Sequence, residues 1–348
     1  MAKNPERASD EELARDNEGF LTSDDLRTGF ITGTTFRNKP VQYSAVDEMA
    51  IFEGDIALGT VDEMERRAAL VQAGAASDDA GIQHGVAITG DQYRWPNALM
   101  PYEIDGGLPN KARVTQAVAH WEANTNMRYV LRTAANASQY PNYVRVFKGS
   151  GCWSSVGMRG GKQDLSLADG CGFGAAVHEF GHAWGLWHEQ SREDRDSFVT
   201  INWANIQSGK EHNFNQHISD GDDIGGYDYG SIMHYGRTAF SKNGLPTIVP
   251  KQSGVTIGQR NGLSAGDIAA VHAIYRTTHV NLTVSQVYAT PHSKNAWAYL
   301  AGHGWRKVDP KAADGVTNVF ACLASARANA HKVHAQIDGA KIYAVYEA

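Results

Sequence analysis

The sequence predicts an α+β protein built from three consecutive parts. Strand-like and helix-like patterns alternate along its 348 residues, a length that agrees with two or three domains. A small, polar stretch over residues 73–81 separates a charged first part from the rest. A helical pattern ending near Tyr275 closes the second part, which carries the motif His178-Glu-Phe-Gly-His182-Ala-Trp-Gly185-Leu-Trp-His188.

This motif has the spacing of a metal site on a helix. Residues four apart share a helix face, so the imidazoles of His178 and His182 can reach one ion. Gly185 is placed to end the helix in the left-handed conformation, after which His188 can return to the ion. Three protein ligands leave a position open for water, as in catalytic zinc sites, and Glu179 is placed to take a proton from that water. Scattered core histidines are the alternative, which the complete motif disfavours.

Composition argues against several classes of partner. A net charge of −6 gives no footprint for nucleic acid. No apolar run approaches the roughly 20 residues that span a bilayer. The first seven residues lack the apolar core of a signal peptide, so export by another route or prior removal of a signal is expected.

Three cysteines suggest a single disulfide. Cys152 and Cys171 flank a short Gly-rich stretch just before the metal-site helix, whereas Cys322 lies far away. One bridge and one free thiol is the favoured interpretation, and three reduced thiols remain the alternative.

The first part, residues 1–85, carries few strongly periodic elements. One helix is predicted from a capping box formed by Thr60 and Glu63, followed by an apolar stripe. Ahead of it, Gly54-Asp55 lies between apolar residues, so the chain there either presents one carboxylate to a surface or simply turns.

The second part has a mixed pattern of strands and helices. Asn110 is predicted to cap a helix over 111–124, Ser264 caps a closing helix over 263–275, and Asn243-Gly244 suggests a hairpin over 240–249. The charged run over 192–196 is, on its own, typical of a solvated face. The remaining elements are strands over 99–104, 128–131 and 143–147, and the metal-site helix over 174–184.

The third part is predicted as a small α+β unit with strands over 282–288, 296–300 and 341–346 and a helix over 314–330. Its aromatic residues Trp297, Tyr299 and Trp305 form either a binding platform or part of the core. Aromatic residues at strand spacing favour the core.

Taken together, the motifs resemble those of the astacin family of zinc metallopeptidases, within the metzincins. The resemblance rests on the histidine motif with Glu189 directly after it, and on Ser231-Ile-Met233-His234-Tyr235 downstream. It covers about residues 87–275 and implies a metzincin-like two-lobed catalytic domain, residues 86–278, with a twisted mixed sheet and an active-site helix. Phe52-x-Gly54-Asp55 resembles the inhibitory signature of astacin zymogens, which makes residues 1–85 a pro-segment and leaves 279–348 as an appended unit of unassigned role.

The resemblance also implies roles for individual residues. His178, His182 and His188 bind one Zn²⁺, and Glu179 is the general base. Tyr235 is a movable fifth ligand that swings away and stabilises the oxyanion.

Further roles follow from the same resemblance. Met233 forms an apolar floor under the metal, and Glu189 is buried and meets the new N-terminus after activation. Asp55 replaces the catalytic water and keeps the enzyme latent. Arg237, two residues after Tyr235, is a hypothesis for selecting an acidic side chain just after the cut. It is alternatively an ordinary surface arginine.

The resemblance implies a secreted endopeptidase with protein or peptide substrates, activated by another protease that cuts near residue 85 or 86. The sequence departs from the family in lacking the second, long-range disulfide that often joins the ends of the domain. Two alternatives are a non-catalytic zinc fold that binds proteins or surfaces through its C-terminal unit, and an enzyme of another metzincin branch. Glu179 argues against the first, and Glu189 with Tyr235 against the second.

Overall fold

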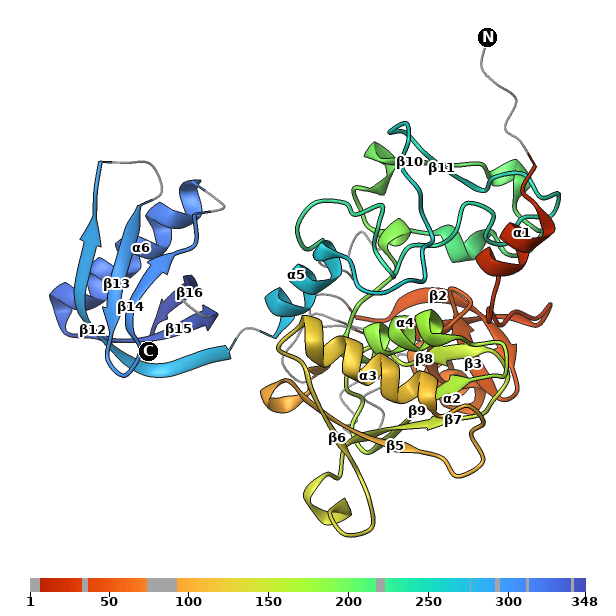
Figure 1. Ribbon diagram of the computed structural model, residues 1–348, viewed down its shortest axis with the longest axis horizontal. Coiled ribbons are helices and arrows are strands. Elements are labelled where there is room, and N and C mark those ends of the chain that lie inside the picture. The colour runs from red at the N-terminus through yellow and green to blue at the C-terminus, as the bar shows by residue number, and fades with distance from the viewer. Residues whose placement is uncertain are drawn as a thin grey trace. The chain divides into compact units, whose positions relative to one another are not determined.

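The computed structural model describes residues 7–32, 37–73, 93–216, 223–275, 277–291, 295–310, 313–338 and 341–348. The chain forms two compact units, Met1–Ile274 and Tyr275–Ala348 (Figure 1). The stretch in which an activating cut was expected, near residues 85 and 86, lies outside the described residues.

The first unit combines a large mixed sheet with helices. Its helices are α1 (Asp10–Asp16), α2 (Val61–Gln72), α3 (Ala112–Asn124), α4 (Phe173–Trp184) and α5 (Ala265–Ile274). Its strands are β1 (Leu26–Ile31), β2 (Lys39–Val46), β3 (Met49–Phe52), β4 (Ile56–Thr60), β5 (Leu99–Ile104), β6 (Arg128–Leu131), β7 (Tyr143–Phe147), β8 (Cys152–Ser154), β9 (Lys162–Leu167), β10 (Val199–Ile201) and β11 (Ile248–Pro250).

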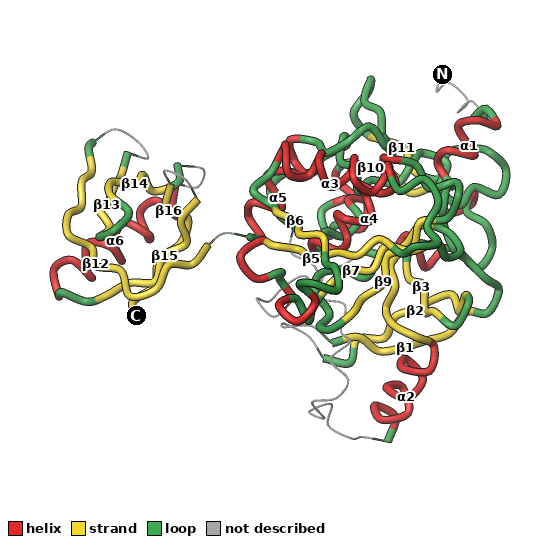
Figure 2. Tube along the Cα trace, turned by 60° about the horizontal axis from the view of Figure 1, so that its bottom comes forward, coloured by secondary structure: helices red, strands yellow, loops and turns green. Residues whose placement is uncertain are grey.

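Nine of these strands form one sheet in the order β1-β2-β3-β4-β8-β9-β7-β5-β6. Figure 2 shows β1, β2 and β3 continuing the yellow sheet that contains β9, β7 and β5. Strands β1 to β4 pair antiparallel with one another, and β4 then joins β8 in parallel at Ile56 and Ser154. The N-terminal segment, residues 7–73, therefore extends the sheet of residues 93–216 across strand β8.

The strands β1 to β4 correct the expectation that the first part has few periodic elements. In β2, alternate residues Val41 and Tyr43 are buried, as in a strand with one covered face. The predicted helix is confirmed as α2, because Glu63 N–H donates to Thr60 Oγ1 and Thr60 N–H donates to Glu63 Oε2. Contacts with β1, β3 and β4 hold α2 against these strands.

Helices α3 and α4 pack against each other beside the sheet (Figure 1). The predicted apolar face of α3 is buried and consists of Val114, Ala117, Val118 and Trp121. The expected cap is wrong: Lys111 occupies the N-cap position with no side-chain hydrogen bond, and Asn110 has a φ of 47°. The predicted cap of α5 is confirmed, because Asp267 N–H donates to Ser264 Oγ.

Two further expectations about the first unit are wrong. Residues 240–249 form no hairpin, because β11 pairs with β10 at Ile201 and Ile248 instead of with its neighbour in sequence. The charged run is no solvated face either, since Arg192 and Arg195 are buried. Arg192 forms a bidentate pair with Asp194, and Arg195 donates to backbone carbonyls. Both buried guanidinium groups therefore have hydrogen-bond partners.

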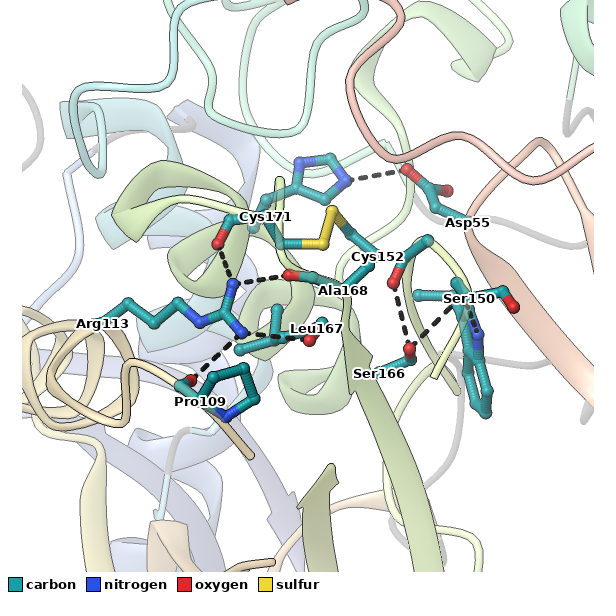
Figure 3. Close-up of a disulfide and its surroundings, with 12 residues drawn as sticks. Asp55, Pro109, Arg113, Ser150, Cys152, Ser166, Leu167, Ala168 and Cys171 are labelled. Atoms are coloured by element: carbon teal, nitrogen blue, oxygen red, sulfur yellow. Dashed lines mark hydrogen bonds and ion pairs between the residues drawn. A yellow bond between two sulfur atoms is a disulfide. The ribbon is translucent and has the colours of Figure 1, made fainter. Parts of the chain in front are cut away.

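A disulfide joins Cys152 of β8 to Cys171, just before α4 (Figure 3). This confirms the favoured interpretation, and Cys322 is a free, half-buried thiol. The buried guanidinium of Arg113 reinforces the same loop by donating to the carbonyls of Leu167, Ala168 and Cys171. The start of α4 is therefore tied both to β8 and to α3.

Removing this disulfide should destabilise the first unit. The cysteines are 19 residues apart, and a loop of that size is worth about 3 kcal/mol in unfolding free energy. We expect the double substitution Cys152→Ala with Cys171→Ala to lower the urea midpoint of the first unit accordingly. Cys322→Ala is the matched control and should leave that midpoint in place. An unchanged midpoint in the double variant would show that Arg113 alone fixes this loop.

The second unit contains β12 (Thr277–Ala289), β13 (Ala296–Leu300), β14 (Gly304–Val308), α6 (Ala313–Asn329), β15 (Lys332–Asp338) and β16 (Lys341–Glu347). Its strands form a closed barrel packed against α6. Strands β14 and β15 were not predicted. The aromatic prediction is also wrong, because Ala296, Ala298 and Leu300 fill the core while Tyr299 and Trp305 are exposed.

Among the helices of the described ranges, none combines the length and the apolar character that a membrane crossing requires.

Candidate metal centre and active site

Helix α4 carries two of the histidines, and a glycine ends it where the motif predicted. His178 and His182 lie one turn apart on this almost completely buried helix. Gly185 has a φ of 104°, a left-handed conformation that lets the chain leave the helix at once. His188 follows in extended conformation, and its ring lies 4.8 Å from that of His182 and 5.4 Å from that of His178, centroid to centroid.

The two imidazoles of α4 are each oriented by a hydrogen bond from the Nδ1 atom. The partner is the Ile232 carbonyl for His178 and the Leu186 carbonyl for His182, both at 2.8 Å. A carbonyl can only accept, so Nδ1 carries the proton in both rings and Nε2 keeps its lone pair. This is the arrangement that holds metal-binding histidines in position.

The Nε2 atoms converge on the carboxylate of Asp55, from the turn between β3 and β4. Asp55 Oδ2 lies 3.2 Å from Nε2 of His178, and Oδ1 lies 3.6 Å from that of His182 and 3.1 Å from that of His188. One ligand atom from each of the four residues falls within 4.8 Å of all the others, and all four residues are buried. His182 Nε2 and Asp55 Oδ1 have no hydrogen-bond partner among the described residues. Three imidazoles and one carboxylate with unused lone pairs fit one zinc ion.

The charges in this cluster fit its geometry. Burial lowers the pKa of His178 to about 3, which keeps that imidazole neutral as a metal ligand requires. Burial would raise the pKa of Asp55, but the His188 charge and the polar contacts with all three imidazoles hold it well below its usual range. Asp55 is therefore suited to serve as an anionic fourth ligand.

Glu179 is buried next to the cluster. Its Oε2 atom has no hydrogen-bond partner among the described residues. Burial raises the pKa of the Glu179 carboxyl, and the nearby Asp55 carboxylate raises it further. A carboxyl group with a raised pKa and a free oxygen beside a metal site is suited to accepting a proton.

Met233 and Tyr235 come from the chain between β10 and β11. Met233 is buried against α4, where a Cβ atom at Gly181 would lie only 2.7 Å from the Met233 sulfur. Arg260 fixes this loop by donating to the carbonyls of Ile232 and His234. The Tyr235 ring lies 4.7 Å from the His188 ring, and its hydroxyl donates to the Glu53 carbonyl at 2.5 Å.

Glu53 is a site residue that the sequence reasoning missed. Its side chain is fully buried, accepts from His188 Nδ1 at 2.7 Å and accepts from Ser191 Oγ at 2.9 Å. The residue immediately before Gly54-Asp55 thus orients the third histidine. The sequence pointed to Glu53 only through its position directly before Gly54-Asp55. An isolated glutamate in a charged segment forms no recognisable motif.

Glu189 is largely enclosed. It accepts from the backbone N–H of Asp228 at 2.7 Å and lies 3.6 Å from the Arg192 guanidinium. Burial outweighs both contacts and raises the pKa of Glu189 to about 8.

Arg237 is paired with the N-terminal segment. Its guanidinium lies 3.3 Å from the carboxylate of Glu12 in α1, and about a third of its side chain is exposed. The same helix ends in Asp16, which is buried and accepts from the N–H and hydroxyl of Thr238. An acidic side chain from residues 7–73 therefore already lies on Arg237.

Comparisons with known proteins identify the family to which the chain belongs. The model of the Astacin peptidase family matches residues 87–276. Zinc metalloproteinase nas-15 from Caenorhabditis elegans is 40% identical over 229 residues, which are 64% of this chain and 39% of that protein. Meprin A subunit beta from Homo sapiens is 42% identical over 235 residues, which are 65% of this chain and 29% of that protein.

Among solved structures, the chain is similar to high choriolytic enzyme 1, a hatching-enzyme zinc protease from Oryzias latipes. The identity is 38%, the match covers 52% of this chain and 92% of that chain, and the TM-score is 0.47. The chain spans less than half of the length of the two curated relatives. The family model nevertheless matches more than half of this chain, and the chain belongs to the astacin family of zinc peptidases.

Proposed function

We propose that the chain is a zinc endopeptidase held in a latent state by its own N-terminal segment. Residues 1–85 are the pro-segment, 86–278 the catalytic domain and 279–348 a separate unit. The supporting observation is the convergence of three buried imidazoles on Asp55, with Glu179 buried beside them.

The chemistry is peptide hydrolysis. His178, His182 and His188 would hold zinc, which when bound polarises a peptide carbonyl and brings the pKa of water near 7. Glu179 takes the proton from the attacking water and passes it to the leaving amine. Tyr235 donates its hydroxyl hydrogen bond to the developing oxyanion once it is released from the Glu53 carbonyl.

Strand β8 is the proposed docking edge for an extended substrate. In the sheet order it lies between β4 and β9, so removal of the N-terminal segment would leave it as an edge strand. Peptides bind such edges by adding a strand. The Asp55 carbonyl accepts from Ser154 N–H at 3.0 Å, so the N-terminal segment blocks this edge and the metal cluster together.

Secretion is part of the proposal. The disulfide between Cys152 and Cys171 supports it, because such bonds persist in oxidising compartments. Substrates would be proteins or peptides, and another protease would remove the pro-segment.

Casein hydrolysis tests the zinc-peptidase proposal. Full-length protein would be treated with a protease that cuts between residues 73 and 93, and activity would be measured on casein. We expect activity that 1,10-phenanthroline abolishes and that added Zn²⁺ restores, because the imidazoles alone cannot polarise the carbonyl. Activity that survives chelation with full metal removal would contradict the proposal, as would an inactive cleaved protein that contains one zinc per chain.

Arg237 is proposed to favour an acidic residue just after the cleaved bond. Its pairing with Glu12 supports this role, since a carboxylate in the N-terminal segment already binds the guanidinium. Peptides with Asp, Ala and Lys at that position should be cleaved in this order, with Asp over Ala by about fivefold for a partly exposed pair. Arg237→Gln should remove the difference, and Arg128→Gln is the control. Equal cleavage rates for the three peptides would contradict this role of Arg237.

A further inference from the structure

The barrel of the second unit has a topology that is known from ligand-binding domains. The strand order is β12-β13-β14-β16-β15, and pairing between β12 and β15 closes the barrel. Only the pair β14 and β16 is parallel among the described strands of this barrel, and α6 lies between β14 and β15 in the chain. A five-stranded barrel with this order and this helix is an OB-fold. Such folds bind oligonucleotides or oligosaccharides on the face of their second and third strands.

Here the second and third strands are β13 and β14, and their outer face is aromatic. Across the strands, Trp297 lies opposite Lys307 and Tyr299 lies opposite Trp305. Tyr288 of β12 extends the first of these rows, because it lies opposite Trp297. We call Tyr288, Trp297, Tyr299, Trp305 and Lys307 the aromatic face.

Three of the four rings in the aromatic face are exposed to solvent. Tyr288 is 52% exposed, Trp305 41% and Tyr299 38%, while the alternate residues of β13 are buried in the core. Tyr299 and Trp305 pack edge to face with ring centroids 5.8 Å apart. The Lys307 ammonium lies 5.7 Å from the Trp297 ring centre. These contacts order the rings on the outside of the barrel, where they add nothing to its core. An exposed apolar patch of this kind is typical of a binding surface.

The chemistry of the face selects one of the two ligand classes. Aromatic rings pack against the C–H faces of sugar rings, and Lys307 with Gln286, opposite Tyr299, can bind sugar carboxylates and hydroxyls. Single-stranded nucleic acid carries a phosphate on each nucleotide, and its binding sites pair stacking rings with a strongly basic groove. Among the described residues, Lys307 is the cation of the aromatic face itself, and Lys341, its register partner in β16, lies 3.6 Å from the Asp309 carboxylate. Arg306 lies opposite the buried Ala298 and so belongs to the other side of β14. Two lysines, one of them offset by a carboxylate, do not make a strongly basic groove.

The positive net charge of the second unit favours an acidic sugar chain. Residues 275–348 contain eight lysines and arginines against four aspartates and glutamates, although the whole chain has a net charge of −6. A row of rings beside Lys307 and the carboxylate-paired Lys341 suits a chain of sugar rings that carries carboxylates instead of phosphates. We propose that the second unit is an OB-fold whose aromatic face binds uronate-containing oligosaccharides.

Calorimetric titration of the full-length protein tests this proposal. The probes are octasaccharides of hyaluronan, polygalacturonate and alginate, with a chitin hexamer and a twelve-nucleotide oligothymidine as comparisons. We expect at least one uronate chain to bind, and Trp305→Ala to weaken it about tenfold or more. Lys307→Gln should weaken it and reduce its salt dependence. Trp305→Phe should bind within about threefold of the unmodified protein, because it keeps a ring.

Matched controls separate binding from folding. Tyr346→Ala removes a similarly exposed tyrosine from β16, outside the aromatic face, and should leave binding unchanged. All variants should keep the thermal unfolding of the unmodified chain. Three outcomes would overturn the proposal: no uronate binding that depends on Trp305, equal binding of the chitin hexamer, or tighter binding of oligothymidine.

Discussion

Substitution of Glu179 by glutamine should remove peptidase activity from the cleaved protein without removing zinc. The buried carboxyl has a raised pKa and an oxygen with no described hydrogen-bond partner, which suits it to the proposed proton transfer and not to metal binding. General acid–base catalysis contributes on the order of 10²–10⁴-fold, and we expect a loss of kcat in that range. Glutamine keeps the size and polarity of the side chain but cannot accept the proton.

The measurement is casein hydrolysis by cleaved Glu179→Gln protein, with zinc content determined on the same sample. Glu193→Gln is the matched control, because Glu193 is an exposed glutamate on the loop after His188. The control should keep full activity. A Glu179→Gln protein that retains more than about a tenth of the activity with one zinc per chain would assign the base to another group.

The metal site could be predicted because its information is local. Two histidines one helical turn apart, a glycine that ends the helix and a third histidine define the cluster within eleven residues. The backbone agrees with each step, including the left-handed Gly185. The disulfide was also predictable, since its two cysteines lie close together in the sequence and the third lies far away.

Features that depend on long-range pairing could not be predicted in this way. The Asn243-Gly244 dipeptide suggested a hairpin. Strand β11 instead pairs with β10, which lies far earlier in the sequence. Nothing local in β4 indicates that it will pair with β8. The orientation of Glu53 onto His188 depends on that pairing and was missed for the same reason.

The aromatic residues of the second unit illustrate a different limit. Alternation along β13 indicates two faces but not which one is buried. Small residues, Ala296 and Ala298, fill the core because α6 packs closely against this strand. The larger rings of Trp297 and Tyr299 therefore lie on the outside, contrary to the expectation from hydrophobicity alone.

The N-terminal segment, to which we attribute latency, contacts the rest of the first unit at more than one place. Asp55 enters the metal cluster, but Phe20 also stacks on Phe240 with ring centroids 4.8 Å apart. The Asn17 side chain donates to the Thr238 carbonyl and accepts from the Phe240 N–H. A variant that loses only the Asp55 carboxylate should keep these anchors. The N-terminal segment would then remain attached to the catalytic domain but no longer occupy the metal.

We therefore expect Asp55→Ala to make the uncleaved chain active, although less so than the cleaved enzyme. Freeing the fourth ligand position should raise casein hydrolysis at least about tenfold above that of uncleaved wild-type protein, because water and substrate gain access to the metal. The β4 pairing with β8 still covers the docking edge, which limits the gain. Mass spectrometry of the assayed sample must show the intact chain, and Asp62→Ala, at an exposed position in the same segment, is the control that should stay latent. An intact Asp55→Ala protein as inactive as wild type would mean that strand pairing and the anchors near Phe240 suffice for latency.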